Sequence, residues 1–517
     1  MPVSYAPIYL TGNRSTVYCG SRWGEGSATR LCESGDRPGR RQGRMPIRRR
    51  FYWGVTITMY ESFLRSASDP WFSPDRVDWH RGSRHDYVKR VGLNVVLAVR
   101  EGKQAIETIG PLLMKWIADA RMLRKAWDIL AAKGNTAPGP NRRRYDDLDD
   151  VEVWSLLRSI GAAIRNDTYR VGEERIVNVP KDRSDPARGT RPISLLNVED
   201  RVVQRAVVEV LQRLFDPLFG RNILGFRPGH GRLHAMALAE QIAVAEGRYV
   251  FTVLDLKDAF TRVPLDRLMD VLAVYIPSED MLRLLNRILD TGKKHGIRQG
   301  GPLSPLLLNL FLHHVLDRPW RKAWPTVPMI RVADDILLIC RSREEAERAR
   351  TGLRALLMPM NMPLKEGRDD TIRDLQIGES AKWLGGVIHK GEDELKVTIS
   401  KRARARLVEY LSLAHEKSDS AIRAVATING WIDQMGPCYP FVNRSWVYRR
   451  LEAIATKQAF DEIPSRDAIA SRWRRAYLRW CDIRNDVRER PEALDSIWAP
   501  PSVNAASEAQ QGISRAS

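Results

Sequence analysis

The chain has 517 residues, which at roughly 150 residues per domain allows about three domains with a sizeable core. Lysine and arginine total 83 against 63 acidic residues, so the net charge is +20, and 17 lysines leave 66 arginines. A hydrophobic fraction of 43% excludes wholesale disorder. The chain contains no apolar run of about 18 residues, which predicts no membrane span, and its first residues show no secretory signal pattern. Five scattered cysteines without a CxxC pair argue against a zinc module or a disulfide framework, and we expect a cytoplasmic protein.

The excess positive charge predicts a polyanionic partner. Arginine presents a planar fork that matches phosphate oxygens, and nucleic acid is the commonest polyanion. A high-GC genome is an alternative explanation of the preference for arginine over lysine, but it does not explain the sign of the net charge.

The two ends of the chain differ from its middle. Residues 1–50 carry 10 arginines against 3 acids and many Gly and Ser, which predicts a basic flexible arm, unless Met45 is the true start. Residues 51–120 read as a helical N-terminal extension. Residues 491–517 include a polar Ala/Ser-rich stretch, which predicts a disordered tail.

The middle of the chain alternates helical and strand patterns. A short strand is expected over 175–180, and apolar residues at helical spacing predict a helix over 200–215. A continuous apolar run predicts a buried strand over 248–256. A buried helix is expected over 303–316, two strands around a tight turn over 329–341, and mostly helix over 401–490.

Three aspartates stand where apolar strands end. Asp255 closes the strand over 248–256, and Asp334 and Asp335 lie side by side in the turn between the next two strands. Burying carboxylates together is costly unless a cation pairs with them, and Mg²⁺ prefers such oxygen ligands. Two ions about 3.5–4 Å apart would activate an attacking oxygen and stabilise a phosphoryl leaving group. The alternative is an ordinary surface turn, which the apolar flanks disfavour.

The motifs around these aspartates resemble those of reverse transcriptases, most closely the bacterial group II intron type. In chain order they are RPISLLNVEDRVVQRAVVEVL, GFRPGHGRLHA, LDLKDAF (motif A), RQGGPLSPLLLNLFL (motif B), VADD (motif C) and KWLGG (primer grip). The resemblance covers about residues 120–460. It implies an α+β right-hand polymerase fold. Fingers and palm would occupy 121–400, with an antiparallel sheet plus helices in the palm, and a helical thumb would occupy 401–490.

The resemblance assigns catalytic roles to the aspartates. Asp255, Asp334 and Asp335 would be the catalytic acids, and together with the carbonyl of Leu256 they would bind two Mg²⁺ ions, with Mn²⁺ as an alternative. The enzyme would be an RNA-directed DNA polymerase that uses dNTPs and an RNA template and makes a DNA product.

Further residues would bind the nucleotide and the primer. Phe260 would exclude a 2′-hydroxyl, with an ordinary core phenylalanine as the alternative, and motif D offers Lys365 or Arg368 near the pyrophosphate. Family position assigns nucleotide binding to Lys181, Arg191, Gln299 and Gly300, and the primer grip to Trp383, Leu384, Gly385 and Gly386. Ser304, Pro305 and Asn309 would shape the motif B helix, and Gly225, Phe226 and Arg227 are interpreted as structural, with template phosphate as the alternative contact for Arg227.

The sequence departs from the family at motif C, where Val332 replaces the usual aromatic residue, and at the primer grip, which reads WLGG. In the thumb, Trp473, Tyr477 and Trp480 share one helix face, and Arg472, Arg475 and Arg479 would reach phosphate from the other or form a solvated face.

The expected biological role rests on absences. No nuclease module follows the thumb in this sequence, and the signatures of retrons and of diversity-generating enzymes are absent. This pattern resembles domesticated, defence-associated enzymes that act against phage with a noncoding RNA. The alternatives are an intron maturase and an RNA-binding protein without catalysis. No membrane partner is expected, and the oligomeric state is not readable.

Overall fold

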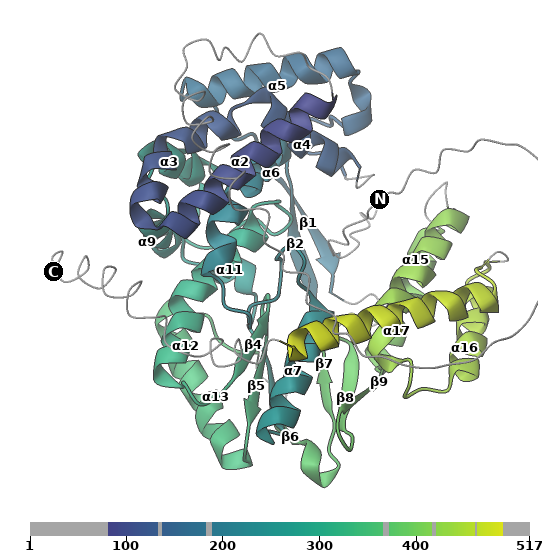
Figure 1. Ribbon diagram of the computed structural model, residues 1–517. Coiled ribbons are helices and arrows are strands. Elements are labelled where there is room, and N and C mark those ends of the chain that lie inside the picture. Colours follow the sequence, from purple (N-terminus) through teal and green to yellow (C-terminus); the bar gives the residue numbers. More distant parts are fainter. Residues whose placement is uncertain are drawn as a thin grey trace, which may run out of the picture. The chain divides into compact units, whose positions relative to one another are not determined.

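The computed structural model describes residues 81–132, 137–181, 189–365, 372–415, 420–460 and 463–489, with side chains from residue 87 (Figure 1). The predicted basic arm, the extension before residue 81 and the predicted tail lie outside the described residues. The elements below belong to one compact unit, which begins at Arg84 within its first helix.

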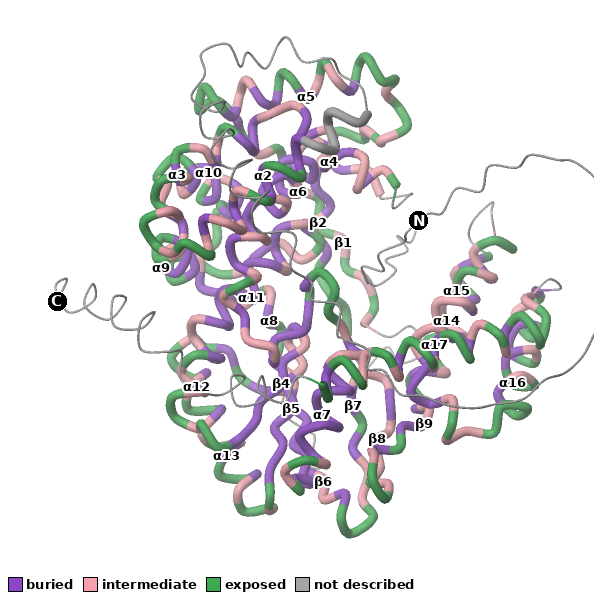
Figure 2. The backbone as a smooth tube through the Cα atoms, viewed as in Figure 1, coloured by how far each residue is buried: buried purple, intermediate pink, exposed green. Residues whose placement is uncertain are grey.

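The first part of the described chain is helical around one hairpin. Its elements are α2 (Arg81–Glu101), α3 (Lys103–Ile117), α4 (Ala120–Ala131), α5 (Asp150–Arg165), β1 (Arg175–Pro180), β2 (Thr190–Leu195) and α6 (Val198–Phe215). The helix predicted over 200–215 and the strand over 175–180 are confirmed. Helix α6 packs against α3, α4 and α11 and is buried along most of its length (Figure 2). Its buried residues include the polar Asp200, Arg201 and Gln204 beside the apolar face that the spacing predicted.

The central part combines an antiparallel sheet with helices. Its strands are β3 (Val250–Asp255), β4 (Met329–Val332), β5 (Asp335–Cys340) and β6 (Ile372–Asp374), in the order β4-β5-β3-β6. Its helices are α7 (Arg232–Glu246), α8 (Ala259–Arg262), α9 (Leu265–Tyr275), α10 (Glu279–Leu289), α11 (Ser304–Leu312), α12 (Arg318–Ala323) and α13 (Arg343–Leu357). The predicted helix over 303–316 is confirmed up to Leu312, after which His313–Asp317 form a π-helical turn.

Both faces of the central sheet are covered, which explains the continuous apolar runs. Alternate residues of a strand point to opposite faces. In β5, Ile336 and Leu338 belong to the core cluster that includes α13, whereas Leu337 and Ile339 belong to the cluster that includes α7. Each face is therefore buried against a helix, and the ends of the strands remain as the place for polar groups.

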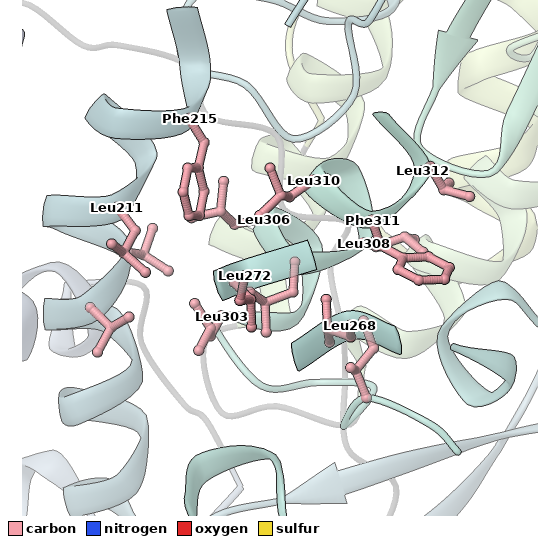
Figure 3. Close-up of a cluster of buried hydrophobic side chains, with 14 of the residues drawn as sticks. Leu211, Phe215, Leu268, Leu272, Leu303, Leu306, Leu308, Leu310, Phe311 and Leu312 are labelled. Atoms are coloured by element: carbon pink, nitrogen blue, oxygen red, sulfur yellow. The ribbon is translucent and has the colours of Figure 1, made fainter. Parts of the chain in front are cut away.

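Helix α11 is surrounded by apolar side chains from distant parts of the sequence. Leu211 and Phe215 of α6 and Leu268 and Leu272 of α9 lie around its leucines (Figure 3). This packing fixes the loop before α11 relative to the sheet.

The last part consists of a small sheet and four helices. Strands β7 (Ala381–Trp383), β8 (Gly386–Lys390) and β9 (Leu395–Ile399) pair in chain order. The helices are α14 (Lys401–Ala414), α15 (Ser420–Gln434), α16 (Arg444–Lys457) and α17 (Arg466–Arg488), which confirms mostly helix over 401–490. Short 3₁₀ turns occupy Tyr145–Asp147, Asp216–Leu218, Met358–Met360, Leu375–Ile377 and Gly436–Cys438.

The described elements form an α+β fold with antiparallel sheets, as expected. Among the described residues no helix is both long and apolar enough to cross a membrane. Cys340, Cys438 and Cys481 are free thiols.

Candidate active site

The strand register brings the three predicted aspartates together. Asp255 at the end of β3 pairs directly with Asp335 at the start of β5. Asp334 precedes Asp335 in the turn between β4 and β5, and its carbonyl accepts a hydrogen bond from Leu256 N–H at 3.1 Å. Ala333 takes a left-handed conformation, with φ of 60°, which makes the turn tight. Residues 79 positions apart in sequence therefore share one edge of the sheet.

The carboxyls at this edge destabilise one another's charged forms. Burial, followed by the charges of Asp334 and Asp255, raises the pKa of Asp335 to about 7. Burial and the charge of Asp255 also raise the pKa of Asp334. Such an arrangement retains protons or attracts a cation, which is the behaviour expected of a metal-binding carboxylate group.

Lys365 provides one cation for this group. Its ammonium forms an ion pair with the Asp255 carboxylate, and its backbone N–H donates to the Asp255 carbonyl at 2.9 Å. Its positive charge opposes part of the rise that burial causes in the pKa of Asp334 and Asp335. The alternative motif D residue, Arg368, lies outside the described residues.

Divalent cations fit the chemistry of this group. The Oδ1 atom of Asp255 is buried without a hydrogen-bond partner, which makes it a free ligand oxygen. Among the described residues no three His, Cys, Asp or Glu side chains are arranged as a finished metal site.

Two basic residues of the β1–β2 hairpin face the carboxylates. Arg191 lies opposite Val179 in the hairpin, and its charge lowers the pKa of Asp334. Lys181 Nζ lies 3.2 Å from Asp258 Oδ1, three residues after Asp255. The hairpin therefore places two cations near this edge of the sheet.

The motif B loop joins the hairpin to helix α11. The carbonyl of Gln299 accepts a hydrogen bond from Ser194 N–H of β2 at 2.8 Å. Gly300 has φ of 112°, a conformation that favours glycine. The Ser304 hydroxyl donates a hydrogen bond to the Arg298 carbonyl at 2.6 Å and so closes the loop at the start of α11. Gln299 and Gly300 are thus placed between the hairpin and the palm.

A buried polar network supports the turn that carries Asp334 and Asp335, and its centre, Arg331, was not predicted from the sequence. Arg331 is fully buried and donates to the Asp317 carboxylate at 2.6 and 2.9 Å. It also donates to Asn309 Oδ1 and to the Ala333 carbonyl, both at 3.0 Å. The signal was available, since a lone arginine within the apolar run MIRVADDILL needs buried partners.

Asn309 extends this network. Its Nδ2 donates to the Gly225 carbonyl at 2.6 Å. Arg227 is also occupied within the fold, because its guanidinium binds Asp216 and the carbonyls of Gly220 and Ile223. The contacts of Arg227 fit the structural interpretation rather than a template phosphate contact.

The primer-grip segment forms a tight hairpin. Leu384 and Gly385 have φ of 46° and 82° and connect β7 to β8, a geometry typical of a type I′ turn. Trp383 is buried, whereas Val332, the residue in place of the usual aromatic, is half-buried against the same core cluster. Gly386 begins β8, where a Cβ would lie 2.8 Å from Val397.

The thumb helix α17 differs in part from expectation. Trp473 and Trp480 are buried, as predicted for the apolar face. Arg472 was expected to reach phosphate or solvent, but it is half-buried and binds Asp433 and the Asn429 carbonyl. Arg479 lies 3.5 Å from Asp433, and only Arg475 of the three is exposed with no such contact to Asp433. The helix spacing predicted the face but not the acidic partner on α15.

An antiparallel sheet that gathers three carboxylates at the ends of β3 and β5, with a basic hairpin beside it, is the arrangement that the resemblance implies for the palm and fingers of a polymerase. Residues 179–368 match the family model described as reverse transcriptase (RNA-dependent DNA polymerase). Over these residues the chain is therefore similar to reverse transcriptases.

Curated relatives are similar to part of the chain. A putative COX1/OXI3 intron 2 protein of Saccharomyces cerevisiae is 29% identical over 219 residues, which are 40% of this chain and 24% of that protein. The group II intron-encoded protein LtrA of Lactococcus lactis is 26% identical over 33% of this chain and 29% of its own length. The chain thus spans about a quarter of the length of these relatives. Protein YkfC of Escherichia coli is 25% identical over 38% of this chain and 53% of its own length.

Solved structures of telomerase are also similar to this chain at low identity. Apo telomerase from Candida tropicalis has a TM-score of 0.37 and 10% identity, covering 64% of this chain and 69% of that one.

Proposed function

We propose that this chain is an RNA-directed DNA polymerase that adds deoxynucleotides to a primer 3′-hydroxyl. The observation that carries the proposal is the direct pairing of Asp255 with Asp335, with Asp334 beside them and Arg191 near enough to lower the pKa of Asp334. Carboxylates and cations at one sheet edge match the needs of phosphoryl transfer, in which charge is stabilised and the reacting groups are aligned.

Asp255, Asp334 and Asp335, with the carbonyl of Leu256, would hold two Mg²⁺ or Mn²⁺ ions. When bound, such ions supply Lewis-acid stabilisation of the attacking and leaving oxygens. The primer hydroxyl attacks the α-phosphate of the dNTP in line, and pyrophosphate leaves. The tight turn at Ala333 and the buried Arg331 hold Asp334 and Asp335 in place for this reaction.

The cations of the fingers would bind the triphosphate. Lys181 directly follows β1 and Arg191 lies on β2 of the same hairpin, and neither is buried. Lys365, which pairs with Asp255, would move to the leaving pyrophosphate once the carboxylates hold ions. Gln299 and Gly300 would line the nucleotide pocket, and the hairpin at Trp383–Gly386 would position the primer end.

Phe260 would select deoxynucleotides. It lies on α8, five residues after Asp255, and its ring is only partly buried against the core. An aromatic ring below the sugar leaves no room for a 2′-hydroxyl.

The direct test is extension of a DNA primer on an RNA template with dNTPs and Mg²⁺. Wild type should incorporate nucleotides, and Asp334→Asn should reduce incorporation at least 10³-fold, roughly the scale of losing an essential electrostatic group. Asp266→Asn, at the start of α9, is a matched control and should retain activity. No incorporation by wild type, or equal incorporation by Asp334→Asn, would favour an RNA-binding protein without catalysis.

We further propose that the enzyme acts in antiphage defence with a dedicated noncoding RNA. Support comes from helices α2 and α3, which precede the matched reverse transcriptase segment and could recognise an RNA partner. An intron maturase is the second candidate, because several relatives are named as intron-encoded proteins. Sequencing of RNA bound to the protein in its host separates the two, since intron lariat favours the maturase and a small adjacent RNA favours defence.

A further inference from the structure

Phe226 contacts the ring that the proposed function uses for sugar selection. The rings of Phe226 and Phe260 meet edge to face, with centroids 6.2 Å apart and an interplanar angle of 71°. Phe226 belongs to the GFRPG segment, 34 residues before Phe260 in sequence. It is 36% exposed, so its ring lies at the protein surface and not within the core.

The segment that carries Phe226 is fixed against the catalytic turn. Leu224 N–H donates to the Arg331 carbonyl at 2.9 Å, and the Gly225 carbonyl accepts from Asn309 Nδ2 at 2.6 Å. A Cβ at Gly225 would collide with the backbone nitrogen of Ala333. The position of Phe226 is therefore tied to the same turn that presents Asp334.

The backbone of Phe226 is strained. Its φ is 57°, a left-handed conformation that a bulky residue rarely adopts. Glycine or asparagine would fit this conformation more easily. An aromatic residue held there against its preference indicates that the ring has a use at this point.

We infer that Phe226 is a positioning residue that fixes Phe260 beneath the sugar of the incoming nucleotide. The inference rests on the proposed polymerase function and adds to it the residue that keeps the selecting ring in place. Phe260 stands on a helix of four residues, and core packing covers only part of its ring. The edge-to-face contact with Phe226 restrains the remaining side. Without it the Phe260 ring can tilt and leave room for a 2′-hydroxyl.

The experiment measures single-nucleotide incorporation of dCTP and CTP, with kcat and KM for each, on an RNA template with a DNA primer. The variants are Phe226→Asn, which suits the left-handed backbone, Phe226→Tyr, which keeps the ring, Phe260→Ala, and the double variant Phe226→Asn/Phe260→Ala. Val274→Ala, at an exposed apolar position of α9, is the control for loss of a surface side chain. Thermal unfolding of each variant reports whether it folds.

Phe226→Asn should lower the preference for dCTP over CTP about 3- to 10-fold, the scale of one aromatic pair, mainly through a lower KM for CTP. Phe226→Tyr and Val274→Ala should keep wild-type preference. The double variant should match Phe260→Ala, because Phe226 acts only through Phe260.

Unchanged preference in a folded Phe226→Asn, with relaxed preference in Phe260→Ala, would overturn the inference and leave the polymerase intact. Additive effects in the double variant would also overturn it. No incorporation by wild type would instead refute the polymerase function and the inference with it.

Discussion

Replacing Arg331 with methionine should lower both the stability of the palm and its activity, and a second substitution at Asp317 should restore only part of the stability. Arg331 is 0% exposed and Asp317 is 2% exposed, so the substitution leaves a carboxylate buried without a partner. Breaking such a buried pair from one side costs about 3–5 kcal/mol of unfolding free energy. The Ala333 carbonyl and Asn309 Oδ1 each lose a donor as well, at about 1 kcal/mol each.

The double variant Arg331→Met/Asp317→Leu removes both charges and tests this reasoning. Apolar replacement of a whole buried pair is nearly neutral, so only the two lost hydrogen bonds should remain, a deficit of about 2 kcal/mol. Activity should stay low in both variants, because the donor to the Ala333 carbonyl in the catalytic turn is missing in both.

Urea unfolding followed by far-UV circular dichroism measures the stability, and primer extension measures the activity. Arg283→Met, which removes an exposed ion pair on α10, is the control and should change stability by less than about 1 kcal/mol. The buried network would be refuted as the support of the turn if Arg331→Met were as stable as Arg283→Met. It would also be refuted if Arg331→Met/Asp317→Leu were as unstable as Arg331→Met.

Three other predictions concern the turn, a buried histidine and the charge. Gly225→Ala should reduce nucleotide incorporation at least tenfold, because the added Cβ collides with Ala333. Gly231→Ala is the control and should retain activity, because a Cβ there meets open space. Equal rates of incorporation by the two variants would contradict the packing. Burial lowers the pKa of His313 to about 3, so the unfolded state binds the extra proton between pH 6.5 and 3. Stability should therefore fall as pH drops below about 6.5, by roughly 1.4 kcal/mol per unit, and His313→Gln should remove that part of the slope in urea titrations at pH 5 to 7. Affinity for structured RNA should fall steeply between 50 and 200 mM salt, by roughly 10³-fold for about six phosphate contacts, and a filter-binding series with little salt dependence would contradict a phosphate grip.

Periodicity and apolar runs were sufficient to predict the elements that carry the site. The strand ending at Asp255 and the two strands around Asp334 and Asp335 form where the sequence predicts them, because burial on both faces favours apolar residues at most positions. Helix α6 was predicted equally well from the spacing of its apolar residues. The direct pairing of Asp255 with Asp335 needed the register, which no local pattern contains.

Contacts between distant charges could not be predicted in this way. Arg331 pairs with Asp317, the last residue of a π-helical turn that the leucine-rich sequence does not predict. Arg472 pairs with Asp433 on the neighbouring helix α15. Helical spacing tells which face of α17 is apolar, but the partner of a charged residue depends on how helices pack. The roles of Lys181, Gln299 and the primer-grip hairpin remain predictions, although their positions near the palm are now known.

The packing of α17 on α7 has a consequence for biosynthesis. Glu240 of α7 is 2% exposed, and its carboxylate binds Arg488 at 2.7 Å and lies 3.7 Å from Arg484, both near the end of the described chain. These counter-ions leave the ribosome more than 240 residues after Glu240, so a nascent palm holds this acid without its partners. Contacts of such sequence separation form slowly and late. The packing around α7 is therefore completed only after α17 has been synthesised, which makes chains truncated before α17 candidates for aggregation or chaperone capture.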